Sequence, residues 1–402
     1  MLVTQHACYG NNKNGVITLI YLMKIIFWLS IFLIFWANIG YPASMIFLDK
    51  IIKKTNEKLT DYEPTVTVMV VAHNEEGVIA DKLMNLLQLD YPKDKFNILV
   101  TSDNSTDRTN EIVNEFVLKY QQIYLYQVEK RQGKTNAQNE ASKLVKSEIL
   151  VMTDANAMLK HDAINELVSS FTNNVAYVTG KLDYINQNES LTSKSESTYW
   201  DLDTRIRDIE SRFQTITAGN GAIYAVRTED YVDFDPIMSH DSAMPLYFNL
   251  LGKRAVANHK AIAYEKAGEN DGDEFKRKIR MARITLHFIL PSIKILNVFK
   301  YKWFTYFYLG HRTVRYLLWF NHIILFIASV VLMSENSHYW LPCVGQLIIY
   351  LIASMKYLFS IDIKIINFIA YYCMTVTAQL IGVLKTILGR NKPFWEKAES
   401  TR

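Results

Sequence analysis

Apolar residues gather near the two ends of this chain. Between Ile25 and Leu48 there is no Asp, Glu, Lys or Arg, and at about 1.5 Å per residue a helix of this length can cross a hydrocarbon core of roughly 30 Å. Three more apolar runs follow later, at Tyr316–Met333, Tyr339–Met355 and Ile365–Leu384. The pattern predicts one membrane-spanning helix before the middle of the chain and up to three after it. The alternative is that all four are buried helices of a soluble core.

The charges that flank these runs indicate their orientation. Lys50, Lys53 and Lys54 follow the first run directly, which predicts that this end lies in the cytoplasm. The linker SENSHY, at Ser334–Tyr339, has no Lys or Arg and is expected to face outward. Three crossings from a cytoplasmic domain would then place the C-terminal tail outside, although the tail, GRNKPFWEKAESTR, is rich in basic residues. Either one segment is re-entrant or the positive-inside rule fails, and the sequence leaves both possibilities open.

The middle of the chain, roughly residues 50–300, alternates two periodic patterns. Short apolar runs predict four strands, at Thr65–Ala72, Phe96–Ser102, Ile123–Val128 and Ser147–Ala155. Segments with helical spacing lie between them. Apolar strands separated by helices predict a parallel sheet that is covered on both faces. Ligands of such sheets bind at the carboxyl ends of the strands, so the polar residues after each strand are the candidates for a site.

Composition and charge exclude several classes of site. Apolar residues make up 50% of the chain, charged residues 21%, and the net charge of +4 is too small to indicate nucleic acid binding. Three cysteines, Cys8, Cys343 and Cys373, have no metal-ligand spacing, so we expect neither a zinc site nor a disulfide framework. No G-x-G-x-x-G follows the first strand, where VVAHNEEG stands instead, and there is no P-loop. The chain is therefore expected to bind its ligand through carboxylates and amides.

Seven short segments occur in a recognisable order. They are VAHNEE (71–76), TSDNSTDRT (101–109), RQGKTNAQN (131–139), TDAN (153–156), GNGAIYAVR (219–227), SHDSAMPL (239–246) and FKRKIRMAR (275–283). With the flanking apolar runs, this series resembles the membrane-embedded, inverting glycosyltransferases of family 2. The resemblance implies a GT-A fold, which is an α/β fold with one mostly parallel sheet and helices on both faces. Here it would carry N- and C-terminal transmembrane helices.

On this basis the chain divides into five parts. We expect an N-terminal segment with a transmembrane helix over residues 1–49, a cytoplasmic GT-A domain over 50–275, amphipathic interfacial helices over 276–312, C-terminal transmembrane helices over 313–389 and a tail over 390–402. The protein is expected in the inner, cytoplasmic membrane as a multi-pass protein with its catalytic domain in the cytoplasm.

The resemblance assigns a nucleotide-sugar donor to residues at the strand ends and on the basic helix, namely Ala72, Glu75, Asp103, Lys134, Asp154, Arg277 and Arg280. Glu75 would accept from the ribose or the base and Asp103 from a uracil imide, which favours a UDP-sugar, although both also suit helix N-caps. Lys134 would neutralise phosphate, or is an ordinary solvated lysine. Arg277 and Arg280 suit a pyrophosphate, and the same helix also suits an anionic lipid surface.

The segment TDAN raises the question of a metal ion. The family has Asp-x-Asp here, and this chain offers a carboxylate, Asp154, and an amide, Asn156. The resemblance implies Mg²⁺ or Mn²⁺ on the donor pyrophosphate, and both ions take oxygen ligands. Asn156 either ligates the ion or only orders the turn.

Asp241 is the expected catalytic base. Inverting transfer needs one carboxylate that takes the proton of the acceptor hydroxyl, and the resemblance places that carboxylate here, although Asp241 also suits a helix cap. The family usually has an acidic residue directly before it, where this chain has His240. The loop residues Gly219, Asn220 and Gly221 are expected on the acceptor side.

The resemblance therefore implies an inverting glycosyltransferase that moves a sugar from a nucleotide-sugar, with a UDP-sugar favoured, to a lipid-linked or growing glycan acceptor at the cytoplasmic membrane face. The expected context is polysaccharide biosynthesis, with membrane lipid and polysaccharide-assembly proteins as further partners and no nucleic acid. One alternative is a catalytically degenerate scaffold of such an assembly machine, which the altered Asp-x-Asp favours. Another is a transporter, against which the few ionisable residues inside the apolar runs argue.

Overall fold

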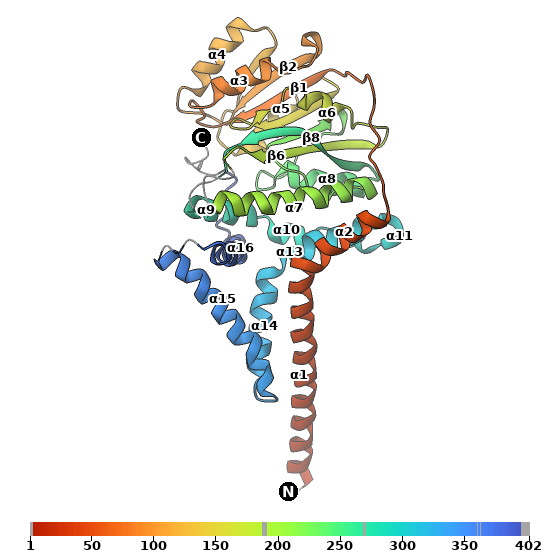
Figure 1. Cartoon of the computed structure of the whole chain (residues 1–402), viewed down its shortest axis with the longest axis vertical. Coiled ribbons are helices and arrows are strands. Elements are labelled where there is room, and N and C mark those ends of the chain that lie inside the picture. Colours follow the sequence, from red (N-terminus) through yellow and green to blue (C-terminus); the bar gives the residue numbers. More distant parts are fainter. Residues whose placement is uncertain (1–2, 187–190, 268–270, 360, 362, 395–402) are drawn as a thin grey trace.

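The molecule has two parts, an α/β domain and a group of long apolar helices (Figure 1). The computed structural model describes residues 3–186, 191–267, 271–359, 361 and 363–394. Residues 395–402 of the predicted tail lie outside the described residues.

One sheet forms the centre of the domain. Its strands are β1 (Val66–Ala72), β2 (Phe96–Ser102), β3 (Ile123–Gln127), β4 (Ile149–Asp154), β5 (Met158–Leu159), β6 (Val175–Tyr184), β7 (Ile223–Arg227) and β8 (Arg254–Glu265). Across the sheet the strands lie in the order β3-β2-β1-β4-β7-β6-β8-β5. The four strands predicted from the sequence are confirmed as β1 to β4.

The helical elements follow in chain order. They are α1 (Val3–Phe35), η1 (Trp36–Gly40), α2 (Tyr41–Ile51), α3 (Ile79–Leu87), η2 (Lys93–Lys95), α4 (Thr109–Lys119), α5 (Lys134–Ser142), α6 (Ala163–Val168), α7 (Leu191–Phe213), η3 (Thr228–Asp230), α8 (His240–Leu250), α9 (Asp271–Ala282), α10 (Thr285–Ile289), η4 (Ile293–Leu296), α11 (Val298–Tyr301), α12 (Trp303–Phe307), η5 (Tyr308–Thr313), α13 (Val314–Tyr316), α14 (Leu318–Leu332), η6 (Ser337–Tyr339), α15 (Trp340–Phe359) and α16 (Lys364–Ile387). The predicted domain boundary between residues 275 and 276 falls within α9.

The register of the sheet brings the carboxyl ends of its parallel strands level. β1 lies between β2 and β4 and is parallel to both, with Ala72 opposite Ser102 and Val71 opposite Asp154. β7 runs antiparallel to β4, and its first residue, Ile223, is opposite Thr153. The chain that enters β7 therefore arrives at the same edge of the sheet, beside the carboxyl end of β4.

Alternate residues of the strands build two cores, one on each face of the sheet. Val66, Val68 and Val70 of β1 pack on one face with α3, α4 and α6. Met69 of β1 points to the other face, where it packs with residues of α5 and α8. All four side chains are fully buried, and burial of each contributes about 1.5–3 kcal/mol. The predicted sheet with helices on both faces is thus confirmed.

The helix α7 lies between the sheet and the apolar helices (Figure 1). Its residues Ile206, Ile209 and Phe213 pack against Tyr41 and Met45 of α2 in a buried apolar cluster. The domain is therefore joined to the N-terminal helix by a packed core rather than by a loose linker.

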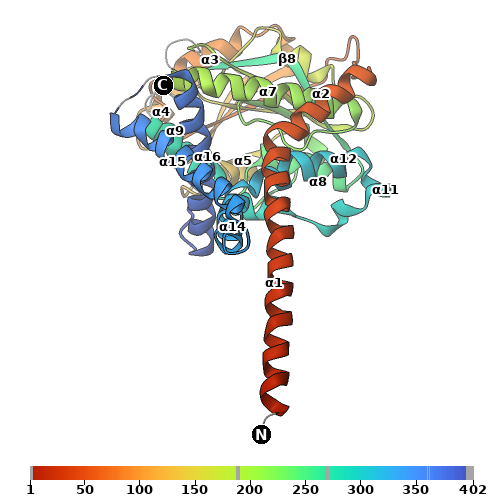
Figure 2. The ribbon, with the colours of Figure 1, turned by 60° about the horizontal axis from the view of Figure 1, so that its bottom comes forward.

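Three helical spans of the described chain are long and apolar enough to cross a membrane, Ile17–Ile51, Ser337–Phe359 and Lys364–Ile387. A fourth exists if Trp303–Tyr316 and Leu318–Leu332, which meet at an angle of 62°, are counted as one span. These segments occupy the positions of the four predicted apolar runs. Figure 2 shows α14, α15 and α16 gathered on one side of α1.

Candidate active site

Asp103, which directly follows β2, holds the loop that leads into α5. Its backbone N–H donates to the carbonyl of Ala72, at the end of β1, over 2.8 Å. Its carboxylate accepts from the backbone N–H groups of Gln132 at 3.1 Å and Gly133 at 3.0 Å. Glu75 is buried just beyond the end of β1, with 7% of its surface exposed. Asp103 therefore positions the loop, and its contact with a nucleobase stays a prediction.

An ion pair joins the start of α5 to the end of β4. It forms between Nζ of Lys134 and Oδ1 of Asp154. The preceding residue, Gly133, has a φ of 95°, which glycine adopts without strain. A Cβ on Gly133 would also lie 2.5 Å from the carbonyl oxygen of Pro393. The C-terminal tail therefore lies directly against the loop that carries Lys134.

Three charged side chains converge on Gly221, just before β7. A Cβ built on Gly221 would lie 3.6 Å from Nζ of Lys134, 3.8 Å from Oδ2 of Asp154 and 3.9 Å from Cγ of Asp241. Burial raises the pKa of Asp241, Lys134 and a hydrogen bond with Ser239 oppose that shift, and Asp154 adds to it. A carboxylate whose pKa is raised in this way is suited to accept a proton near neutral pH.

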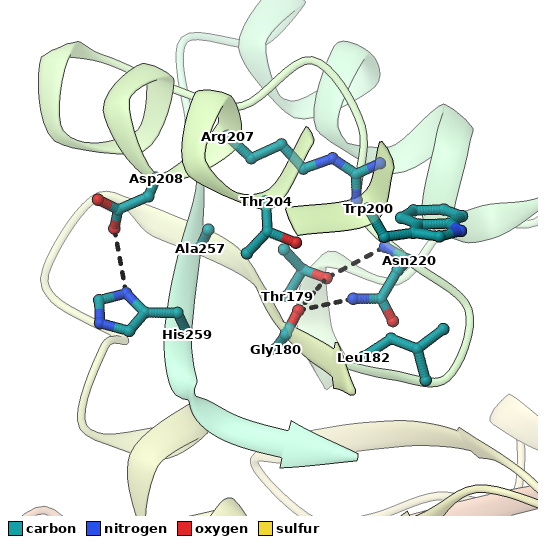
Figure 3. Close-up of a pocket in the computed structure, with 10 residues that line it drawn as sticks. All are labelled: Thr179, Gly180, Leu182, Trp200, Thr204, Arg207, Asp208, Asn220, Ala257 and His259. Atoms are coloured by element: carbon teal, nitrogen blue, oxygen red, sulfur yellow. Dashed lines mark hydrogen bonds and ion pairs between the residues drawn. The ribbon is translucent and has the colours of Figure 1, made fainter. Parts of the chain in front are cut away.

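The loop before β7 is fixed by hydrogen bonds to two neighbouring elements (Figure 3). The side-chain amide of Asn220 donates to the carbonyl of Gly180 at 2.6 Å, and its backbone N–H donates to Oγ1 of Thr179 at 3.1 Å. The backbone N–H of Gly219 donates to the carbonyl of Asp241 at 2.8 Å. The residues predicted on the acceptor side thus tie the carboxylate-bearing turn of α8 to the sheet.

Two aromatic residues of the sequence lie close to this loop in different ways. Trp200 lines a small pocket beside Asn220 (Figure 3), with the guanidinium of Arg207 5.5 Å from its ring centroid. Tyr224 is 1% exposed and stacks on Tyr177, so it belongs to the core. Of these two aromatic residues, Trp200 is the one that lines a pocket.

The residues around Asp154 fit a hard divalent cation. Asp154 supplies a carboxylate, and the amide of Asn156 is oriented because its nitrogen donates to Oε1 of Glu265 at 2.6 Å. Among the described residues there is no group of three or more His, Cys, Asp or Glu that would hold a metal ion. This donor set suits Mg²⁺ or Mn²⁺ sites, in which one or two protein oxygens are completed by phosphate and water. Asp154, with Asn156 beside it, would hold such an ion.

Comparison with protein-family models decides the class of this site. Residues 67–231 match the model of glycosyl transferase family 2, a span that contains β1 to β7 and most of the converging side chains. Residues 67–231 therefore form a glycosyl transferase family 2 domain. Asp241 and the basic helix lie beyond the matched residues, so their roles rest on geometry.

Relatives of this glycosyltransferase include enzymes of polysaccharide and glycolipid synthesis. The probable glycosyltransferase YdaM of Bacillus subtilis is 28% identical over 322 residues, which are 72% of this chain and 73% of that protein. A poly-beta-1,6-N-acetyl-D-glucosamine synthase of Staphylococcus epidermidis is 23% identical over 281 residues, 68% of this chain and 67% of that one. A beta-monoglucosyldiacylglycerol synthase of Nostoc sp. is 31% identical over 143 residues, which cover 35% of this chain and 31% of that enzyme.

A solved structure shares the fold of nearly the whole chain. The mannosyltransferase PcManGT of Pyrobaculum calidifontis, in complex with GDP-Man and Mn²⁺, superposes with a TM-score of 0.70. It is 20% identical, and the match covers 92% of this chain and 100% of that one. The GT-A fold expected from the sequence is therefore confirmed.

Arg277 and Arg280 of the basic helix α9 lie in different surroundings. Arg277 is held by Glu274, with Nε 2.7 Å from Oε2. Burial lowers the pKa of Arg280 to about 10, with the neighbouring charges of Arg277 and Arg283 adding to the shift and Asp154 opposing it. Arg280 thus lies within electrostatic reach of Asp154, whereas Arg277 is paired with Glu274 of its own helix, and their contact with a pyrophosphate stays a prediction.

His240 does not replace the acidic residue that the family usually has there. It is 1% exposed, stacks on Tyr231 and lies 2.8 Å from the Tyr231 hydroxyl through Nε2. Burial, with a smaller effect of Lys134, lowers its pKa to about 3. The imidazole is therefore neutral near pH 7 and serves the packing of α8.

Two functional residues escaped the sequence interpretation. Lys82 of α3 is fully buried and donates to Oγ1 of Thr153 at 2.9 Å and to the carbonyl of Ala157. These two hydrogen bonds stabilise the turn that carries Asp154. The sequence held a signal for Lys82, because this lysine occupies the apolar face of its helix. The second residue is Glu265, at the end of β8. No local sequence pattern reveals the position of that strand.

Proposed function

We propose that this family 2 glycosyltransferase transfers a sugar, with inversion, from a nucleotide-sugar to a lipid-linked or growing glycan acceptor at the membrane surface. The observation that carries the proposal is the convergence of Lys134, Asp154 and Asp241 on Gly221, at the carboxyl ends of β4 and its neighbours. This arrangement places two anionic groups and one cation around the backbone of Gly221.

Asp241 acts as the general base. It takes the proton of an acceptor hydroxyl as the hydroxyl oxygen bonds to the anomeric carbon, and the bond from that carbon to the nucleoside diphosphate breaks with its electron pair on the diphosphate. Its raised pKa keeps it a competent proton acceptor near neutral pH. No covalent intermediate is needed.

The donor pyrophosphate lies among Lys134, Asp154 and Arg280. Lys134 and Arg280 supply positive charge, and a divalent ion held by Asp154 would add charge that stabilises the leaving diphosphate. The nucleotide is a UDP-sugar in our proposal, on the strength of Asp103. A GDP-sugar is the competing donor, since the structural neighbour was solved with GDP-Man.

The setting is the cytoplasmic face of the inner membrane. The apolar spans that flank the domain keep the site at a surface where lipid-linked acceptors collect. The relatives that make a polysaccharide and a glycolipid support both acceptor classes, with membrane lipid and polysaccharide-assembly proteins as partners.

Release of nucleoside diphosphate tests the proposal. Purified enzyme in lipid is supplied with UDP-glucose, UDP-N-acetylglucosamine, UDP-galactose or GDP-mannose, each with Mg²⁺ or Mn²⁺ and a membrane lipid extract as the source of acceptor. Asp241→Asn should lower release by about 10²–10⁴-fold. The exposed Asp235→Asn, whose Oδ1 accepts only from a backbone N–H within its own turn, should match wild type. Equal release by wild type and Asp241→Asn would refute the base, and no release with any donor would favour the scaffold alternative.

A further inference from the structure

The apolar helix α16 contacts the catalytic domain along most of its length. Near its start, the ring of Tyr371 lies 4.3 Å from Nζ of Lys278 in α9. Near its end, Oγ1 of Thr386 donates to the carbonyl of Arg283 at 2.9 Å. These two contacts are separated by about 22 Å of helix at 1.5 Å per residue, which is most of a hydrocarbon core of roughly 30 Å.

The contact between the two helices is close as well as long. A Cβ on Gly382 of α16 would lie 2.6 Å from Cβ of Ala282, at the end of α9, so the glycine lets the two backbones approach. About one turn before Gly382, the side-chain amide of Gln379 donates to the carbonyl of Arg315 in α13 at 3.2 Å. The helix α16 is therefore part of the underside of the domain.

The partner helix α9 cannot lie in hydrocarbon. Its sequence, DGDEFKRKIRMA, carries three acidic residues in its first turn and basic residues after them, and each charge costs several kcal/mol at the centre of a bilayer. If α16 crossed the membrane, the charged helix packed along it would be drawn into the bilayer. In Figure 1, α16 is seen nearly end-on, whereas α1 is seen from the side and runs vertically.

The other apolar helices mark the two sides of the membrane. Lys356, near the end of α15, pairs with Asp271 at the start of α9 at 2.7 Å, so α15 ends on the catalytic side. Lys24 of α1 pairs with Glu335, in the turn between α14 and α15, at 3.7 Å. That turn and Lys24 therefore lie at the same depth, on the side of the membrane opposite the domain.

We propose that α16 does not cross the membrane but lies along its surface on the catalytic side. The chain then crosses three times, by α1, α14 and α15, and its tail returns to the domain. Exposed apolar residues of α16, namely Ile365, Phe368, Leu384 and Ile387, contact the lipid surface, which is the partner that they fit.

This arrangement removes the conflict over the charged tail. Arg283 donates to the carbonyls of Lys392 at 2.9 Å and Pro393 at 3.3 Å, and the guanidinium of Arg131 lies 4.8 Å from the ring centroid of Phe394. The tail is therefore held by the cytoplasmic domain itself. The described basic residues after α15, which are Lys364, Lys385, Arg390 and Lys392, then lie on the same side as Lys50, Lys53 and Lys54, as the positive-inside rule requires.

Cysteine labelling in intact cells tests the proposal without reference to activity. In the full chain with its three native cysteines replaced, single cysteines are introduced as Ser337→Cys, Lys364→Cys, Ser400→Cys and, as the domain control, Lys119→Cys. A membrane-impermeant maleimide should label only the Ser337→Cys protein from outside, and the other three only after the membrane is permeabilised. Each variant is first checked for correct folding by gel filtration.

Three outcomes would overturn the proposal. Labelling of Ser400→Cys from outside, with Lys364→Cys protected, would show that α16 crosses. Labelling of Lys364→Cys from outside, with Ser400→Cys protected, would show that α16 crosses and that α14 and α15 do not form a two-helix crossing. Protection of all four cysteines would place the turn at residue 337 on the catalytic side and contradict the three crossings.

Discussion

Lys82→Met tests whether a buried lysine braces the turn that presents Asp154. Lys82 is 0% exposed, and its ammonium donates to Thr153 and to the carbonyl of Ala157, the residues on either side of the Asp154–Asn156 turn. Methionine has a similar length and removes only the charge and the hydrogen bonds. The change therefore isolates the electrostatic part of the contact.

The size of the effect follows from the pKa of the lysine. Burial lowers it from an ordinary value of 10.5 to about 7, against the opposing effects of Asp154 and Glu265. Between pH 7 and pH 9 the unfolded chain keeps the proton that the folded chain loses, so the stability of the wild type rises with pH. At about 1.4 kcal/mol per pKa unit, and with Lys82 already half deprotonated at pH 7, the gain over this interval is about 2 kcal/mol. The Lys82→Met variant lacks this gain in stability.

Thermal unfolding in detergent at pH 7, 8 and 9 measures this difference. Relative to Lys82→Met, the wild type should gain about 2 kcal/mol between pH 7 and pH 9, or about 4–8 °C in Tm for a domain of this size. The exposed Lys119→Met is the control for loss of a lysine charge and should track the wild type. Parallel pH curves for wild type and Lys82→Met would refute the reasoning.

Three further predictions concern the site. Lys134→Met removes the charge that lowers the pKa of Asp241, so the acid limb of the kcat/KM profile should move to higher pH. An unmoved limb would contradict the effect of Lys134 on the pKa of Asp241. Asp154→Ala should abolish activation by Mn²⁺, while Glu265→Ala, which releases the Asn156 amide, should raise the Mn²⁺ required by about 10-fold; full activation of Asp154→Ala by Mn²⁺ would exclude Asp154 as the ligand. Gly219→Ala should cost most of the activity because the new Cβ would lie 1.9 Å from the Tyr177 hydroxyl oxygen, and Tyr177→Phe should restore part of it; a fully active Gly219→Ala would show that the loop adapts.

Local sequence patterns predicted that polar residues follow the parallel strands at one edge of the sheet, and the resemblance assigned these residues to a donor. The strands β1, β2 and β4 are short apolar runs that end in polar residues, and parallel register alone brings Ala72, Asp103 and Asp154 to one edge. Their placement depends only on strand length and direction. For this reason the sequence located them to within one residue of the observed strand ends.

The acceptor half could not be predicted from local patterns. Asp241 reaches the site because Gly219 donates to its carbonyl and because β7 is inserted antiparallel beside β4. Neither contact leaves a periodic signal in the sequence. The resemblance to a family supplied Asp241, and geometry then showed which groups surround it.

The acceptor loop is also joined to the apolar helices by buried charged groups. Arg207 of α7 donates to the carbonyl of Gly219 at 2.7 Å and pairs with Asp203 at 2.5 Å. His311 of η5, which leads toward α14, lies 3.0 Å from Asp203 and 2.7 Å from Glu210. Asp203 also pairs with Arg315, and Glu210 also accepts from Tyr41, so removal of one member takes away one of several partners and should cost less than the about 3–5 kcal/mol of a fully broken buried pair. The position of the acceptor loop therefore depends on the packing of the apolar helices, and the catalytic domain should not keep its active geometry when it is cut away from them.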